Sequence, residues 1–306
     1  MSKKKNNVSL ESTLKSMDTE EWLDLKFYRP IGYQWALFFK KLGVSPNTIT
    51  ILSIFIGIAA GVLFYFPDLK LNLIGMFCLI WANSYDSADG QLARMTKQYS
   101  RIGRILDGVS GDFWFIAIYM AICLRLYNDW GLWIWILAAA AGECHSIQAA
   151  SADYLRNFHL FFVKGKNGSE LDDSNTVKEQ AKALKWKGNF VEKFFMLFYV
   201  PYTKSQERRT PKMQAFRKTL EEKFGEEGPT QEFSEAFRKE SKPFMKYTNI
   251  LSFNTRVIAL FICLFINEPW LYFVFELVIL NSLLIYMSIG YERLCKRFDL
   301  RLRGNA

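Results

Sequence analysis

Four aspartates interrupt an otherwise apolar region of the chain. They are Asp86, Asp89, Asp107 and Asp112, and small residues and an arginine lie between them. Carboxylates beside apolar segments of membrane length are costly and usually mark a functional site. Asp86 and Asp89 are three residues apart, so on a helix they share one face. Asp107 falls near the start of the next apolar segment, so we expect carboxylates from two helices to face one another.

Facing carboxylates repel one another unless a cation lies between them. Hard oxygen ligands suit Mg²⁺ or Mn²⁺, and Mg²⁺ commonly joins a few carboxylates to substrate phosphates. The pattern therefore predicts a phosphoryl-transfer site with one or two metal ions, held by Asp86, Asp89, Asp107 and Asp112. The alternative is a surface charge pattern at helix ends, which does not explain the full spacing.

The same stretch resembles the signature of the CDP-alcohol phosphotransferases (CDP-alcohol phosphatidyltransferases), membrane enzymes that make phospholipid head groups. The signature contains, in order, Asp, Asp-Gly, Ala-Arg, Gly, Asp and a last Asp. The matching positions in this chain are Asp86, Asp89, Gly90, Ala93, Arg94, Gly103 and Asp107. The upstream SPNTIT stretch, from Ser45 to Thr50, also resembles the family.

The resemblance implies a metal-dependent transfer of a phosphatidyl group from CDP-diacylglycerol to an alcohol, with release of CMP. It also implies that Gly90, Ala93, Arg94 and Gly103 line the cytidine-diphosphate site, and that the protein is a homodimer. Inositol or inositol phosphate is the favoured acceptor, while glycerol phosphate, serine and an amino-alcohol remain open. The alternatives are a CDP-alcohol donor with a lipid acceptor, and a catalytically degenerate membrane scaffold.

The chain departs from the signature at its last aspartate. That residue is expected at position 111, where this chain has Gly111 followed by Asp112. In the family the last acid is taken to deprotonate the acceptor hydroxyl. On a regular helix Asp112 would point about 140° away from Asp107. We favour a π-bulge between Gly108 and Gly111 that brings Asp112 into line. The alternative is that Asp112 is structural and another group takes the proton.

The composition of the chain favours a membrane over a nucleic acid as its partner. Half of the 306 residues are hydrophobic, and 39 basic against 30 acidic residues give a formal charge of +9. The basic residues flank the apolar segments, which favours anionic lipid and a positive cytoplasmic side over nucleic acid.

The five cysteines are scattered, so neither a zinc site nor a disulfide framework is indicated. The polar N-terminus predicts no cleavable signal peptide.

The expected fold is an all-α integral membrane protein. A span needs about 20 apolar residues. Six transmembrane helices are predicted at residues 46–66, 71–94, 103–126, 130–154, 251–266 and 270–291. The distribution of Lys and Arg among the loops places both termini and the aspartates on the cytoplasmic side, in the inner membrane if the source is bacterial.

The remaining segments complete a four-part division. The predicted parts are a cytoplasmic tail with an amphipathic helix (1–44), spans one to four with the aspartates (45–160), a cytoplasmic helical insert (161–247), and spans five and six with a basic tail (248–306). Within the first part, residues 20–42 are read as an interfacial helix broken near Pro30, or as a plain connector. The insert is expected to cap the membrane surface; its role stays open.

Two arginines are candidate contacts for a phosphorylated acceptor. Arg156 follows the fourth predicted span, and Arg256 lies within the fifth, where it needs a partner or a polar cavity. The alternative for both is snorkelling to lipid head groups. His145 and His159 do not have a metal-ligand spacing and are interpreted as structural.

Overall fold

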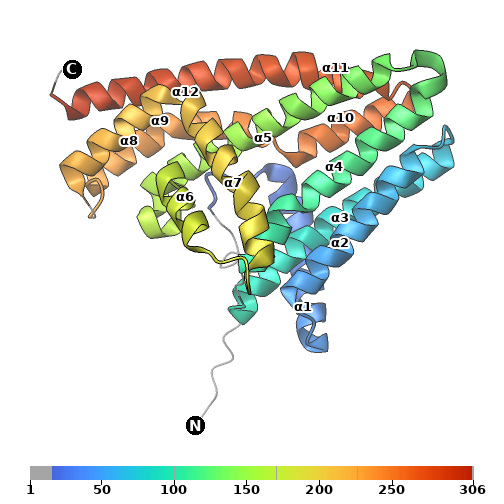
Figure 1. Cartoon of the computed structure of the whole chain (residues 1–306), viewed down its shortest axis with the longest axis horizontal. Helices are drawn as coiled ribbons and strands as arrows, with labels where there is room; N and C mark the ends of the chain where they lie inside the picture. The colour runs from blue at the N-terminus through green and yellow to red at the C-terminus, as the bar shows by residue number, and fades with distance from the viewer. Residues whose placement is uncertain (1–15, 99–100, 170, 226, 305–306) are drawn as a thin grey trace, which may run out of the picture. The chain divides into compact units, whose positions relative to one another are not determined.

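The computed structural model describes residues 16–98, 101–169, 171–225 and 227–304. Within these ranges all regular structure is helical and no strand occurs, which confirms the all-α class. The predicted polar tail lies mostly outside them. The chain, which is drawn in Figure 1, divides into two compact units. The first unit contains residues 1–140 and 258–273, and the second contains residues 141–257 and 274–306.

The first unit begins with a π-helical turn and a helix of 14 residues, and three longer helices follow. Its elements are η2 (Asp24–Tyr28), α1 (Arg29–Leu42), α2 (Pro46–Phe64), α3 (Leu69–Thr96) and α4 (Arg101–Trp130). Local sequence sets the helix starts: the Ser45 hydroxyl accepts from the Thr48 amide before α2, and the Asp68 carboxylate accepts from the Leu71 amide before α3. Such side chains satisfy amides that have no partner within the helix.

Helix α2 packs against both α3 and α4 through small residues. The indole of Trp114 on α4 donates to the carbonyl of Ser53 at 3.1 Å and lies directly over Gly57. A Cβ added at Gly57 would be 2.1 Å from that ring. Because only glycine leaves this space, the sequence of α2 allows α4 to approach its backbone closely.

Helix α1 packs on α3 and buries an aromatic cluster there. Ala36 and Phe39 from α1 meet Tyr85, Ala88 and Leu92 from α3. The break that the sequence predicted near Pro30 is wrong, because η2 runs directly into α1 and the proline occupies its first turn. Proline is tolerated there, since the amide it lacks would be unpaired anyway.

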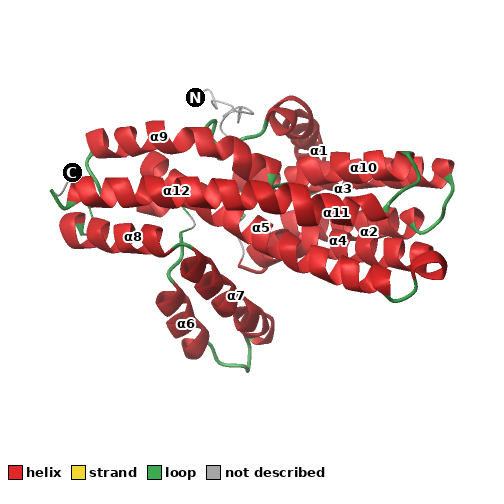
Figure 2. Cartoon of the chain, turned by 90° about the horizontal axis from the view of Figure 1, so that it is seen from above, coloured by secondary structure: helices red, strands yellow, loops and turns green. Residues whose placement is uncertain are grey.

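The second unit contains the helical insert and the C-terminal helices. Its elements are most of α5 (Trp133–Lys164), η3 (Lys166–Gly168), α6 (Ser174–Ala183), α7 (Phe190–Arg209), α8 (Pro211–Phe224), α9 (Gln231–Ile250), the start of α10 (Phe253–Phe265), the end of α11 (Trp270–Val274), the π-helical η4 (Phe275–Leu280) and α12 (Asn281–Leu302). In Figure 2, α8 and α9 flank α12, and the α6–α7 pair stands away from them.

A phenylalanine-rich core holds the second unit together. Phe158, Phe162, Phe216 and Phe237 from α5, α8 and α9 pack as one buried cluster that extends to α12. Glu292 on α12 also accepts hydrogen bonds from two backbone amides at the start of α8, at 2.8 and 3.0 Å. These contacts anchor α8 to α12 by both apolar burial and a helix cap.

Four helical stretches of the described chain have the length and composition to cross a membrane. They are residues 46–64, 106–130, 231–265 and 270–302. They overlap four of the six predicted spans, whereas the predicted spans in α3 and α5 are not among them. The chain is therefore a membrane protein by these four helices, and the full count of six is not confirmed.

Candidate active site

Three aspartates from two helices converge in the first unit. Asp86 and Asp89 on α3 and Asp107 on α4 each place one carboxylate oxygen within 4.8 Å of the others. Asp89 is 3% exposed, Asp86 is half-buried and Asp107 is exposed. The cluster is thus closed on one side and open on the other, so a bound group could approach from the Asp107 side. We call these residues the Asp triad.

Two hydroxyl groups orient the carboxylates of the Asp triad. The Thr50 hydroxyl donates to Oδ2 of Asp89 across the α2–α3 contact. The Ser110 hydroxyl donates to Oδ1 of Asp86 at 2.9 Å. Neither residue was among the predicted site residues. Thr50 closes the SPNTIT stretch, and Ser110 follows Asp107 by three residues on the same helix face, so both carried a usable signal.

Asp112 lies outside the Asp triad. Helix α4 is an uninterrupted α-helix from Arg101 to Trp130, so the predicted π-bulge between Gly108 and Gly111 is wrong. Asp112 is exposed and follows Asp107 by five residues, which on an α-helix turns its side chain about 140° away. A side chain at position 111, four residues after Asp107, would point to the same side of α4 as Asp107, but Gly111 carries no carboxylate. A Cβ at this position would meet nothing within 4 Å.

The other predicted motif residues lie on the same two helices as the triad. The guanidinium of Arg94 lies over Gly90, where an added Cβ would be 3.4 Å from both terminal nitrogens. Ala93 is half-buried on α3, and Gly103 lies in the first turn of α4. Glycine at position 90 therefore lets the cationic group of Arg94 lie close to the backbone beside Asp89.

The triad fits a divalent cation in the chemistry of its donors. Three carboxylates supply only oxygen atoms and repel one another at this separation. Oxygen-only donor sets suit Mg²⁺ and Mn²⁺ rather than softer metals. Among the described residues, no other group of histidine, cysteine or acidic side chains converges in this way.

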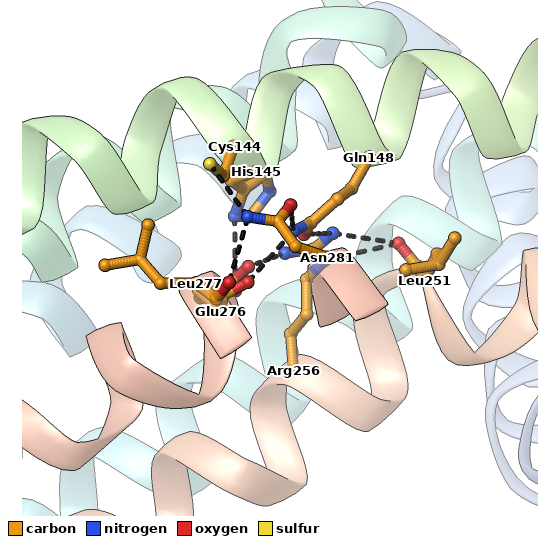
Figure 3. Close-up of polar contacts among 8 residues, drawn as sticks. All are labelled: Cys144, His145, Gln148, Leu251, Arg256, Glu276, Leu277 and Asn281. Atoms are coloured by element: carbon orange, nitrogen blue, oxygen red, sulfur yellow. Dashed lines mark hydrogen bonds and ion pairs between the residues drawn. The ribbon is translucent and has the colours of Figure 1, made fainter. Parts of the chain in front are cut away.

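The two candidate acceptor contacts, Arg156 and Arg256, lie in the second unit. Arg256 is 1% exposed, forms an ion pair with Glu276, and donates to the Gln148 side-chain oxygen at 2.9 Å (Figure 3). It also donates to the carbonyl of Leu251 at 3.1 Å. Its charge is therefore already neutralised inside the protein.

Polar side chains extend the network around Glu276. His145 Nδ1 lies 3.5 Å from Glu276 Oε1, and the Gln148 amide donates to the Asn281 side-chain oxygen at 2.7 Å (Figure 3). The buried Arg256–Glu276 pair, with its remaining polar atoms satisfied, holds α5, α10 and η4 to one another.

The other histidine that the sequence predicts to be structural is His159. It forms a hydrogen bond with Ser241 at 2.7 Å.

Arg156 has a more open environment than Arg256. It is half-buried, and its Nη2 atom donates to the Ser252 hydroxyl at 2.7 Å and to the Asn249 side-chain oxygen at 3.3 Å. These partners are neutral, so the positive charge of Arg156 stays available to an anion.

Comparison with known proteins finds a family match for the segment that carries the Asp triad. Residues 43–156 match the family model described as CDP-alcohol phosphatidyltransferase. A curated relative from Aquifex aeolicus (strain VF5), named "Bifunctional IPC transferase and DIPP synthase", is 26% identical over 99 residues. That similarity covers 32% of this chain and 22% of the relative, so the chain spans about a fifth of the relative's length.

Proposed function

We propose that this chain, whose residues 43–156 match the family model described as CDP-alcohol phosphatidyltransferase, is a transferase that carries out one specific reaction. The protein moves a phosphatidyl group from CDP-diacylglycerol to an alcohol and releases CMP, as a step of phospholipid biosynthesis. The observation that carries the proposal is the Asp triad, which lies inside the matched segment.

The residues of the site divide the chemistry between them. Asp86, Asp89 and Asp107 hold a divalent ion, Mg²⁺ or Mn²⁺, which when bound neutralises the donor pyrophosphate and the departing CMP. The acceptor oxygen forms a bond to the phosphorus beside the lipid, and the phosphoanhydride bond to CMP breaks. Asp107 is the exposed member of the triad and takes the hydroxyl proton. Arg94, beside Gly90, contacts a donor phosphate.

The acceptor is the least determined part of the reaction. Inositol or inositol phosphate is the first to test, with glycerol phosphate and serine beside it. Arg156 supports a phosphorylated acceptor, because its hydrogen-bond partners are neutral. Arg256 supports it less, because Glu276 already pairs with its charge. The relative's printed name contains two activities, but the shared segment is too short to transfer either.

The membrane arrangement is part of the proposal. We assign six spans by adding α3 and α5, which have 28 and 32 residues and are therefore long enough to cross. The Asp triad and both termini face the cytoplasm, where the basic residues gather. A homodimer is the expected assembly, with membrane lipids around it.

Release of CMP by the purified full chain tests the reaction. The protein, in lipid nanodiscs with CDP-diacylglycerol and Mg²⁺ or Mn²⁺, is offered a panel of alcohols. Asp107→Asn removes a triad carboxylate, and Asp112→Asn is the matched control on the same helix. We expect one acceptor to support release, Asp107→Asn to lower it at least ~100-fold, and Asp112→Asn to change it less than about threefold.

Three outcomes would each contradict a different part of the proposal. Loss of release in Asp112→Asn would place the proton acceptor there, against the geometry of α4. Release only with a CDP-alcohol and a lipid acceptor would invert the donor. No metal-dependent release with either donor type would favour the scaffold.

A further inference from the structure

The amino-terminal half of α7 exposes a continuous apolar face. Its side chains recur at helical spacing, and on an ideal helix they fall within an arc of about 120°. Each is between 44% and 64% exposed. These residues, which we call the α7 apolar face, are Phe190, Val191, Phe194, Leu197 and Phe198. Aromatic and aliphatic side chains in such a continuous stripe usually have a partner.

Lysines and a tryptophan border the α7 apolar face. Trp186, four residues before the helix, is 48% exposed. The ammonium of Lys193 lies 5.7 Å from the centre of the Trp186 ring and donates to the Leu184 carbonyl at 2.6 Å. Lys185 and Lys187 are exposed on either side of the tryptophan. The face therefore combines an apolar surface with a cationic rim.

Hydrogen bonds attach the carboxy-terminal half of α7 to the rest of the second unit. Thr203 and Gln206 are buried, and the Gln206 amide donates to the Ala150 carbonyl on α5 at 2.8 Å. Tyr199 donates to Asp172 at 2.5 Å, and Glu207 accepts from the first amide of α6 at 2.8 Å. In Figure 2 the α6–α7 pair stands away from α8, α9 and α12. The pair is thus anchored at one end and presents its apolar face at the other.

We propose that the α7 apolar face lies in the interfacial region of the bilayer, with Lys185, Lys187 and Trp186 among anionic lipid head groups. Helix α7 is not one of the candidate spans found in the described chain, whereas four other helices are. A helix with an apolar face, too polar to span, typically lies along the interface, and lysines beside it attract anionic lipid. Protein–protein interfaces are depleted in lysine, so the cationic rim favours lipid over a second copy. The inference is independent of the transfer reaction.

Spin-label accessibility of the full chain in nanodiscs tests this placement. The five native cysteines, Cys78, Cys123, Cys144, Cys263 and Cys295, are first replaced by alanine. A nitroxide is attached at Phe198→Cys, and the matched control is Lys218→Cys on α8, whose side chain is 77% exposed. We expect oxygen to relax the label at 198 more than a water-soluble nickel chelate does, and the reverse at 218.

Equal nickel access at the two positions would overturn the proposal. Dipolar broadening between labels at 198 would also overturn it, by assigning the face to a second copy. If the cysteine-free chain does not fold, quenching by doxyl-labelled lipid is compared in wild type and Trp186→Phe. A smaller quenched fraction in the variant supports the placement of Trp186 in lipid, and an equal fraction contradicts it.

The head-group contact has its own test. Nanodiscs of phosphatidylcholine alone are compared with nanodiscs that also contain phosphatidylglycerol. We expect the label at 198 to lie deeper with phosphatidylglycerol, and Lys185→Glu with Lys187→Glu to abolish that difference. A depth that responds to neither lipid composition nor charge reversal would refute the lysine contact.

Discussion

Replacing Arg256 with methionine would leave a buried carboxylate without its strongest partner. Glu276 is 0% exposed, and its other ionisable neighbour is His145, whose Nδ1 atom lies 3.5 Å from Oε1 of Glu276. Breaking a buried ion pair on one side costs about 3–5 kcal/mol, and Glu276→Met should cost a similar amount from the other side. The double variant removes both charges together. It leaves the Gln148 oxygen and the Leu251 carbonyl without their donor, at about 1–3 kcal/mol each.

The two changes should therefore be far from additive. The single variants together would cost about 6–10 kcal/mol, whereas the double variant should cost about 2–6 kcal/mol, which is well below that sum. Reversible unfolding in mixed micelles, followed by far-UV circular dichroism, gives the three free energies of unfolding. Additivity to within about 0.5 kcal/mol would refute the coupling. A double variant that regains stability while its KM for a phosphorylated acceptor rises would instead show that Arg256 contacts substrate.

Three further changes test the first unit. Thr50→Val removes the donor to buried Asp89, and we expect a loss of about 1.5–3 kcal/mol in the free energy of unfolding, read by chemical denaturation. Gly57→Leu places side-chain atoms where the Trp114 indole lies, so the folded yield should fall sharply in size-exclusion chromatography, while Gly111→Ala, in open space, keeps it. Gly111→Asp adds a fourth carboxylate on the triad side of α4 and should tighten Mn²⁺ binding, measured by electron paramagnetic resonance titration; unchanged affinity would contradict the direction assigned to position 111.

Local spacing predicted that Asp86, Asp89 and Asp107 converge, although the predicted set also contained Asp112, which lies outside the triad. Asp86 and Asp89 are three residues apart on α3 and so share a helix face, and Asp107 lies in the second turn of the next helix, α4. The supporting hydroxyl of Thr50 comes from α2, and this long-range contact depends on how closely α2 and α3 pack. Periodicity within one segment carries no information about that approach.

The predictions that failed concern the choice between permitted conformations. Glycines at 108 and 111 permit a π-bulge, but a Cβ at either position would meet nothing within 4 Å, so no packing constraint forces one. The α-helix then keeps its regular hydrogen bonds. The prediction that Arg256 needs a partner inside an apolar segment is met by Glu276, yet nothing in the sequence around Arg256 identifies that residue, twenty positions later on another helix, as the partner.

The π-helical segment η4 fits one more residue between two hydrogen-bond partners of Gln148 than an α-helical turn would. The Glu276 carbonyl and the Asn281 side chain both contact Gln148, although five residues would separate them by about 140° on an α-helix. The wider turns of η4 (Phe275–Leu280) bring the two positions toward the same side. Deleting a single residue between Glu276 and Asn281 would leave them four residues apart, which an α-helix places within about 40° of one another. Relatives that are one residue shorter here could therefore keep both contacts to Gln148 with a regular α-helix, whereas a chain of the present length needs the π-helical turn.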